Sequence, residues 1–372
     1  MKKILTCAAI LALAAAVQAA SFTPGNLVVT RVGDGGAALS NAATPTFIEE
    51  YTVSGTYVQT IGLPTVVSGS HRRLTNSGTA TSEGFLTRSV DGQYLTLAGY
   101  DAAVGTPSVV STTSANVNRV VARVDLYGNI DTTTALNDTY SANNIRSAVS
   151  TNGIDLWLGG TGGTGNNGVR YTTLGSTTST QLNSTNPTNI RVVNIYNGQL
   201  YASSASGAFQ GVSTVGTGLP TTSGQTVTLL PGFPTVSGPS SYDYWFASDS
   251  VLYVADDRTV ANGGGIQKWV YDSNTSLWSL VYTLNTDLNA GARGLVGAFD
   301  VNGAPVLYAT TTEANNNRLV TVTDLGASSS FTTLAFAGTN KAFRGVDFTP
   351  IPEPGTLALL GLGGLLLIRR RA

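Results

Sequence analysis

The feature that most constrains the fold is a repeated pair of short apolar strands joined by a tight turn. Four pairs are joined by a turn of the Asn-Gly or Asp-Gly kind, and these dipeptides tolerate the positive φ angles of tight hairpins. They are Phe85–Val90 with Tyr94–Leu97, Ile145–Ser150 with Ile154–Leu158, Ile190–Tyr196 with Leu200–Ala202, and Leu295–Val301 with Val306–Tyr308. A fifth pair, Tyr244–Ala247 with Leu252–Val254, has the turn Ser248–Ser250. No long amphipathic helix is predicted between residues 21 and 350, so the pattern indicates an all-β protein.

The first strands of these units recur along the chain, near residues 85, 145, 190, 244, 295 and 343. The N-terminal strands form a unit that lacks its first strand, and the C-terminal strand is a first strand with nothing after it. These end strands are Leu27–Val32, Phe47–Val53 and Thr56–Leu63 at one end and Ala342–Phe348 at the other. A repeated unit that cannot bury both faces alone must stack on its neighbours.

We therefore predict a six-bladed β-propeller of four-stranded blades, in which the two ends of the body share the closing blade. A closed ring of blades leaves no open end. Five or seven blades remain open, and a β-sandwich or a β-helix is the competing architecture. The repeat is too long for one coil of a β-helix.

Charge and cysteine content limit the possible partners. Two of the 20 basic residues lie in the N-terminal stretch and three in the C-terminal one, while one of the 21 acids lies at the C-terminus. The body then has 15 basic and 20 acidic residues and a net charge of −5. This argues against nucleic acid as a partner, because such proteins need a basic surface. With His71 alone and no cysteine after Cys7, a zinc site cannot be filled.

The N-terminus has the features of a secretory signal peptide. Lys2 and Lys3 precede the apolar stretch Ile4–Val17, and small residues favour cleavage after Ala19. An N-terminal membrane anchor is the alternative. Cys7 precedes most of the apolar stretch, so a lipoprotein signal is not expected.

The C-terminus combines a proline motif, a short apolar stretch and a basic end. Pro352, Glu353 and Pro354 are followed by the uncharged stretch Thr356–Ile368 and by a basic cluster of three arginines, namely Arg369, Arg370 and Arg371. As a helix the apolar stretch would span about 20 Å, less than the ~30 Å of a bilayer core. We expect a short transmembrane helix whose arginines stay in the cytoplasm and act as a membrane stop.

This three-part tail resembles the PEP-CTERM protein-sorting signal, although Ile351 stands where that family often has Val. The resemblance implies a Gram-negative bacterium, export through signal peptidase and transient retention in the inner membrane. It also implies processing by an exosortase near Pro352–Pro354, and a final place at the outer surface or in an exopolysaccharide matrix. The predicted domains are a signal peptide (1–19), a propeller body (20–350) and a sorting signal (351–372).

Five arginines near the first strands form the most suggestive constellation. They are Arg88, Arg146, Arg191, Arg293 and Arg344. First strands line the channel of a propeller, so inward-pointing arginines would form a cationic ring that binds a carboxylate or sulfate. The alternative is that each arginine pairs with an Asp or a backbone carbonyl of the neighbouring blade.

Other candidate residues favour structural roles. His71 has no neighbouring carboxylate to orient it, and we interpret it as a loop or channel-lining residue. Asp256-Asp257 and Asp34 lack the spacing of a calcium loop, although oxygen ligands keep Ca²⁺ open. The glycine-rich stretch 159–165 lacks the Gly-Lys-Ser/Thr ending of a phosphate loop.

We therefore expect an exported, non-catalytic protein without a cofactor, whose body is a binding or structural module, with exopolysaccharide as a candidate partner. The alternatives are a propeller hydrolase or lyase acting on a polysaccharide or lactone, and a structural array without a ligand. Fold alone does not choose among them.

Overall fold

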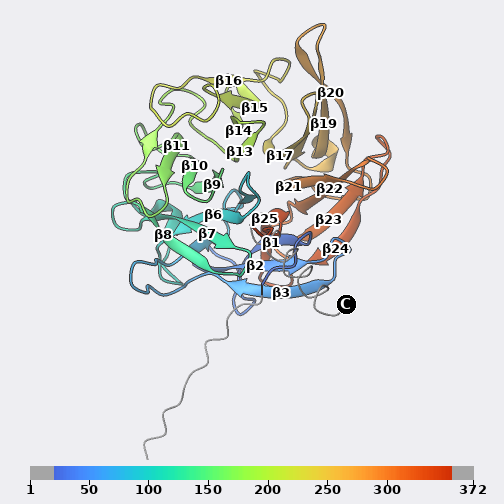
Figure 1. Ribbon diagram of the computed structural model, residues 1–372. Helices are drawn as coiled ribbons and strands as arrows, with labels where there is room; N and C mark the ends of the chain where they lie inside the picture. Colours follow the sequence, from blue (N-terminus) through green and yellow to red (C-terminus); the bar gives the residue numbers. More distant parts are fainter. Residues whose placement is uncertain (1–20, 354–372) are drawn as a thin grey trace, which may run out of the picture.

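The computed structural model describes residues 21–353. This segment forms twenty-five β-strands and two short 3-10 helices, η1 (Val109–Ser111) and η2 (Val260–Asn262). The sheets are arranged around a common centre (Figure 1).

Four of the sheets are separate and contain four antiparallel strands each. Their strands are β9 (Ile145–Ser150), β10 (Asp155–Gly160), β11 (Gly168–Thr173) and β12 (Thr180–Gln181); β13 (Val193–Tyr196), β14 (Gln199–Ser206), β15 (Phe209–Val215) and β16 (Val227–Leu229); β17 (Ser241–Ser248), β18 (Val251–Asp256), β19 (Gly265–Asp272) and β20 (Leu277–Leu284); and β21 (Ala292–Phe299), β22 (Pro305–Thr311), β23 (Arg318–Thr323) and β24 (Thr332–Phe336).

The other nine strands form one continuous sheet in the order β25-β1-β2-β4-β6-β7-β8, with β3 beside β2 and β5 beside β6. They are β1 (Leu27–Val32), β2 (Ala43–Tyr51), β3 (Tyr57–Gly62), β4 (Thr75–Ser77), β5 (Leu86–Arg88), β6 (Tyr94–Tyr100), β7 (Arg119–Asp125), β8 (Ile130–Leu136) and β25 (Ala342–Phe348). The first and last strands of the described segment pair antiparallel in this sheet, with Leu27 opposite Phe348 and Val32 opposite Ala342.

The prediction of six separate four-stranded blades is wrong, because the structure has four separate blades and one nine-stranded sheet. The cause is β4, which lies between the predicted strands Thr56–Leu63 and Phe85–Val90, where no strand was predicted. β4 pairs with the start of β2, where Ala43 faces Ser77, and it also pairs with β6 through Thr75 and Tyr100. β4 thereby joins the strands β25, β1, β2 and β3 to the strands β5, β6, β7 and β8, two groups that the sequence analysis assigned to separate blades.

The predicted turns place glycine where a positive φ is needed. The turn between β13 and β14 has two residues, since Tyr196 pairs with Gln199, and both Asn197 and Gly198 have positive φ, 47° and 72°. This is the geometry that matches the twist of a hairpin. Longer loops with glycine at positive φ follow β5, β9 and β21; their glycines are Gly92, Gly153 and Gly303.

The core lies between the sheets, because each sheet presents apolar side chains on both faces. One contact joins the sheet β13–β16 to the sheet β17–β20: Phe246 of β17 stacks on Tyr196 of β13, with ring centroids 4.6 Å apart, and also contacts Tyr201 of β14. Within the same core, Phe233 stacks on Trp269 at 3.9 Å. Burial of apolar faces of this kind stabilises the packing of neighbouring sheets, by about 25 cal/mol per Å² of apolar surface.

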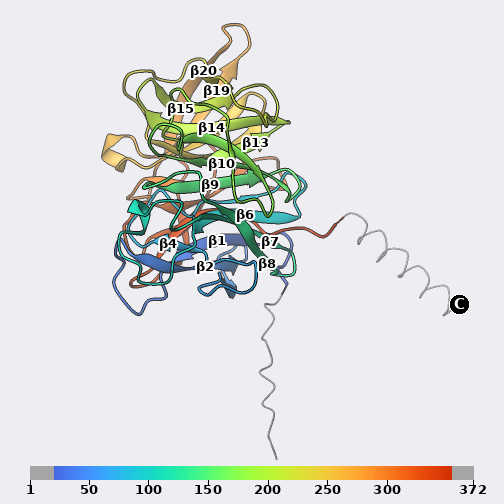
Figure 2. The same ribbon diagram turned by 90° about the vertical axis from the view of Figure 1, so that its left-hand side faces the viewer.

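Six strands surround the centre: the first strand of each separate sheet (β9, β13, β17 and β21) together with β5 and β25. Each of them contacts the next strand or its sheet around the ring. Figure 1 shows β9, β13, β17, β21 and β25 facing the middle, and Figure 2 shows β9 and β10 between β13 and β6 from the side. We call the axis that these six strands surround the central channel, and the two ends of that axis its mouths; the starts of the strands lie toward one mouth and their ends toward the other.

The predicted signal peptide, the apolar stretch Thr356–Ile368 and Arg369–Arg371 lie outside the described residues, so the structure does not test them. Between residues 21 and 353, the chain has no helix with the length and apolar character that a membrane span requires.

Candidate functional site

Near their start, four inner strands carry a β-bulge that takes a side chain out of the ladder. The pairing with the next strand skips one or two residues in β9, β17, β21 and β25. The skipped residues include Arg146, Tyr242, Arg293 and Arg344. A bulge bends the strand and re-aims the side chain, which is why bulges are frequent at barrel rims and binding sites.

Two glycines after these arginines let the inner strands approach one another closely. A Cβ atom at Gly294 would lie 2.6 Å from the carbonyl oxygen of Arg344, and one at Gly345 would overlap the backbone of Phe85 and Leu86. The dipeptide Arg-Gly thus does two things at once: the arginine turns toward the centre, and the glycine keeps its strand against the neighbouring one.

The re-aimed side chains meet around the ring of Tyr242. The guanidinium carbon of Arg191, from the segment before β13, lies 3.9 Å from the ring centroid, and that of Arg293 lies 5.6 Å away. Arg146 lies close enough to Arg191, and Arg344 close enough to Arg293, for their charges to repel. We call these four arginines and Tyr242 the arginine cluster. Stacking of arginine on tyrosine is a cation–π contact, favourable by roughly 0.5–2 kcal/mol.

Each of three arginines in the cluster has some protein partners. Arg146 Nη1 donates to the carbonyl of Ile190 at 2.9 Å and to the Asn189 side chain. Arg344 Nη2 donates to the carbonyl of Gly78 at 2.9 Å. Arg293 forms an ion pair with Asp257 at 3.3 Å. The alternative predicted from the sequence, pairing with an Asp or a carbonyl of a neighbouring unit, therefore describes part of the hydrogen bonding.

Three other donors of the cluster are not satisfied by the described residues. The Nε atoms of Arg146, Arg191 and Arg344 are buried, and none has a hydrogen-bond partner within residues 21–353. Arg146 and Arg344 are only 8% and 2% exposed. A buried donor without a partner costs about 1–3 kcal/mol, and more when it carries a charge. Three such donors on charges of one sign favour an anion at this place.

The electrostatics of the cluster agree with this view. Burial, and then the neighbouring Arg191, lower the pKa of Arg146 to about 10. Burial, and then Arg293, lower the pKa of Arg344 to about 10. Both guanidinium groups remain charged at neutral pH, so the repulsion persists until an anion compensates it.

One acid, Glu83, lies beside the cluster but is already fully engaged. Its side chain is buried and accepts hydrogen bonds from Ser77 N at 3.0 Å, from Asn144 Nδ2 at 2.6 Å and from the Tyr100 hydroxyl. Burial raises the pKa of Glu83, although these hydrogen bonds oppose the shift. Glu83 therefore shapes the wall of the site, and its oxygens are not free for a ligand.

The fifth arginine of the predicted ring, Arg88, lies at the other end of the channel. It is the last residue of β5, and its guanidinium donates to the carbonyl of Thr349 at 3.2 Å and stands 5.8 Å from the Phe348 ring centroid. The structure thus brings four of the five arginines together, and it places Arg88 in a cavity of about 380 Å³ at the opposite mouth.

Two acids on the inner strands, the buried Asp243 and the partly buried Asp347, were not singled out from the sequence. Asp243 accepts hydrogen bonds from Tyr244 N at 2.9 Å and from Leu295 N at 3.1 Å, and burial raises its pKa well above the usual range. Asp347 accepts from Arg88 N at 2.6 Å, and burial raises its pKa too. Both carboxyls join neighbouring inner strands.

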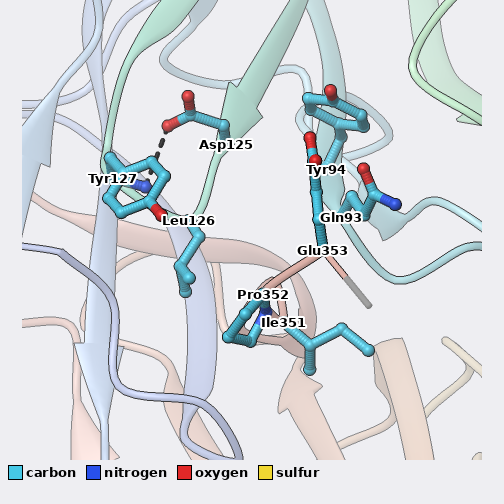
Figure 3. Close-up of a pocket in the computed structure, with 8 residues that line it drawn as sticks. All are labelled: Gln93, Tyr94, Asp125, Leu126, Tyr127, Ile351, Pro352 and Glu353. Carbon is cyan, nitrogen blue, oxygen red and sulfur yellow. Dashed lines mark hydrogen bonds between the residues drawn. The ribbon is translucent and has the colours of Figure 1, made fainter. Parts of the chain in front are cut away.

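The start of the predicted sorting motif rests on the body. Ile351 N donates to the carbonyl of Gly92 at 2.9 Å, and Pro352 and Glu353 line a cavity of about 230 Å³. Figure 3 shows Ile351, Pro352 and Glu353 beside Gln93 and Tyr94 and near Leu126. Pro354, the third residue of the motif, lies outside the described residues.

The other candidates are engaged in local structure. His71 Nδ1 accepts from Thr132 N at 3.4 Å, and Asp256 binds Arg258 in a two-pronged ion pair with both contacts at 3.0 Å or less. Stretch 159–165 enters the loop after β10. In the part of the chain that the structure describes, no three His, Cys, Asp or Glu side chains are grouped so that they could hold a metal ion.

Tyr242 and Glu83 belong to the site, yet the sequence analysis did not single them out. Both occupy the same place relative to an inner strand as the four arginines. The tripeptides Glu83-Gly84-Phe85, Arg293-Gly294-Leu295 and Arg344-Gly345-Val346 share a pattern of charge, glycine and apolar residue that could have identified the position of Glu83. Tyr242 carries no such signal, because Asp243 replaces the glycine.

Comparison with known proteins identifies the C-terminal segment. Residues 350–372 match the family model of the PEP-CTERM protein-sorting motif. Together with the body, this defines an all-β, propeller-like protein that carries a C-terminal sorting signal. The chain thus carries a PEP-CTERM sorting motif, and the motif implies export and processing by an exosortase.

No curated protein matches the chain in sequence. Among solved structures, a candidate 6-phosphogluconolactonase from Bacteroides uniformis is 12% identical over 84% of this chain and 82% of that chain, with a TM-score of 0.46. Its counterpart from Bacteroides fragilis is 13% identical over the same shares, also at 0.46. A protein from Lactobacillus plantarum is 10% identical over 84% and 82%, at 0.43. At these scores the likeness supports no inference about activity.

Proposed function

We propose that this protein is an exported, non-catalytic binding protein of the outer surface or the exopolysaccharide matrix, and that the arginine cluster holds an acidic group of a polysaccharide. The sorting motif supports export. The observation that carries the binding role is the convergence of four arginines around Tyr242, three of which have a buried Nε atom without a partner among residues 21–353.

The chemistry of the cluster favours a carboxylate or a sulfate. A guanidinium group presents parallel N–H donors that fit the two oxygens of such groups. An anion between Arg191 and its neighbours would both satisfy the free donors and relieve the repulsion within each arginine pair. A neutral ligand would satisfy the donors only.

The alternative, a hydrolase or lyase, is the weaker proposal. A general acid or base must reach the substrate. Glu83 has the raised pKa that such a role needs, but it is 0% exposed and all its described contacts are structural. The free groups of the site are donors, which bind an anion without moving a proton.

The test is calorimetric titration of the full chain, purified in a non-ionic detergent, with oligogalacturonate, dextran sulfate and uncharged dextran. We expect at least one acidic polymer to bind, uncharged dextran not to bind at this site, and the affinity to fall as salt rises. Arg191→Gln should weaken binding about tenfold or more, since a charge-assisted hydrogen bond contributes about 1.5–3 kcal/mol.

The matched control is Arg72→Gln, which makes the same charge change at a partly buried arginine outside the cluster. It should leave the affinity unchanged. The proposal fails if neither acidic polymer binds, or if both arginine variants bind as tightly as the unmodified protein.

A further inference from the structure

The cavity at the mouth opposite the arginine cluster is a second candidate binding site. Its volume is about 380 Å³, and its walls come from five inner strands (β5, β13, β17, β21 and β25) and the turns after two of them, among them Arg88, Asn194, Tyr196, Trp245 and Asp347. This volume lies within the range of roughly 300–1,000 Å³ that is common for small-molecule sites. Because the cluster lies about three residues further back on the same strands, the two sites are separated by roughly 10 Å.

Aromatic rings form much of the cavity wall, and the structure holds them in place. Tyr196 is stacked on Phe246 with an interplanar angle of 13°. The indole of Trp245 lies against Gly297, where a Cβ atom would overlap the ring, and its centroid is 5.4 Å from that of Phe299. Trp245 and Tyr196 both remain partly exposed. Fixed aromatic faces of this kind bury a flat apolar face at low entropic cost.

Polar groups at the cavity wall are oriented and partly free. Arg88 uses Nη1 for the carbonyl of Thr349, and among residues 21–353 its Nε and Nη2 have no acceptor. Asn194 accepts from Ile195 N through Oδ1 at 2.8 Å, which directs its amide and leaves the Nδ2 donors free in the described segment. The carboxyl of Asp347 is fixed by Phe348 N at 2.6 Å.

The charge of this cavity differs from that of the arginine cluster. Arg88 and Asp347 are of opposite sign and lie side by side, since the backbone N–H of Arg88 donates to the Asp347 carboxyl at 2.6 Å. An anion would gain from Arg88 but lose against Asp347. A hydroxyl group can accept from the guanidinium or the amide and donate to the carboxyl, so polyhydroxyl compounds suit both sides.

From these observations we propose that the cavity binds a neutral sugar ring, with one ring face on the aromatic wall and its hydroxyls on Arg88, Asn194 and Asp347. The proposal goes beyond the acidic-group site of the arginine cluster and does not depend on it. A polysaccharide could occupy either site without the other.

The test is titration of the full chain with three neutral hexasaccharides, namely cellohexaose, maltohexaose and chitohexaose. We expect at least one to bind and to change the fluorescence of Trp245. Val90→Trp should reduce that affinity at least tenfold, because Val90 lines the cavity, is 58% exposed and can carry a larger side chain without disturbing the core. Arg88→Gln should reduce it as well.

Val301→Trp is the matched control, because Val301 is fully exposed and does not line the cavity. It should bind as the unmodified protein does. Arg191→Gln should also leave neutral-sugar binding intact, which separates this site from the arginine cluster. The proposal is overturned if none of the three sugars binds, or if Val90→Trp and Val301→Trp bind equally well.

Discussion

The substitution Asp243→Asn tests how the inner strands are joined. The carboxyl of Asp243 is 2% exposed, accepts two backbone N–H groups, and has a pKa raised chiefly by burial. In the unfolded chain the same carboxyl titrates near its ordinary value of about 3.9. Between these two pKa values the folded protein keeps a proton that the unfolded chain has lost.

The sign of the effect follows from this difference. An acid with a raised pKa in the folded state contributes full stability below the unfolded pKa, and this stability is lost as the pH rises toward the folded pKa. The free energy of unfolding falls by about 1.4 kcal/mol per pH unit for each such group in that interval. Asp347 and Glu83, whose pKa values are also raised by burial, add slopes of the same sign.

The assay is urea denaturation at a series of pH values from about 4 to about 7, followed by tryptophan fluorescence. Asp243→Asn cannot ionise, so its stability should decline less steeply than that of the unmodified protein, by up to about 1.4 kcal/mol per pH unit. At the acidic end it should be less stable by about 1 kcal/mol, because the amide cannot accept from both backbone N–H groups.

Asp34→Asn, the same change at an exposed acid, serves as the control and should keep the slope of the unmodified protein. If Asp243→Asn and the unmodified protein lose stability in parallel across this pH range, the carboxyl is not held protonated, and the description of the inner strands is incorrect.

Three further predictions concern packing, the tail and the cluster. Gly345→Ala should destabilise the fold by about 1–3 kcal/mol or more in urea denaturation, because its methyl group would overlap the neighbouring inner strand. Gly163→Ala, where the methyl group meets nothing within 4 Å, should not destabilise the fold, and equal stabilities of the two variants would contradict the prediction. Ile351→Ser should speed release of a C-terminal fragment in limited proteolysis, because the Ile351 side chain packs against Gly92 of the body. Ile154→Ser, at a similarly exposed site, should not change the rate, and unchanged cleavage of Ile351→Ser would show that its contact with Gly92 is unimportant. Asp257→Asn should tighten binding of acidic polymer about two- to fivefold by freeing one arginine, and weaker binding would count against the cluster.

The strands with strong apolar patterns were predictable from the sequence. The predicted ranges Leu27–Val32, Ile145–Ser150 and Ala342–Phe348 match β1, β9 and β25. β-Branched and aromatic residues bounded by turn residues identify such strands regardless of their tertiary neighbours. The number of separate sheets was not predictable in the same way, because Thr75-Asn76-Ser77 of β4 has no apolar pattern. Its polar side chains instead bond to the neighbouring strands: Asn76 Nδ2 donates to the carbonyl of Ala98 in β6 at 3.1 Å, and Asn76 Oδ1 accepts from Thr46 Oγ1 in β2 at 3.1 Å.

The site was predictable in part. Four of the five arginines meet because they stand at equivalent positions near the starts of inner strands, and the sequence shows this position. The sequence could not show that Arg88 is the last residue of its strand while Arg146 is the second residue of its own. Which end of a short strand a residue occupies depends on where the strand begins, and the sequence does not define that boundary to within one or two residues. It also could not show the bulges, which depend on pairing with the next strand. Tyr242 was missed for this reason.

The central claim is that the arginine cluster holds an acidic group. Its most direct measurement is a crystal structure of the protein soaked in selenate, with the anion located by its anomalous signal. We predict a peak within hydrogen-bonding reach, about 3 Å, of the Arg191 guanidinium and of the free Nε of Arg146 or Arg344, and its loss in Arg191→Gln crystals. A cluster without anomalous signal, at selenate concentrations that displace oligogalacturonate in solution, would contradict the claim.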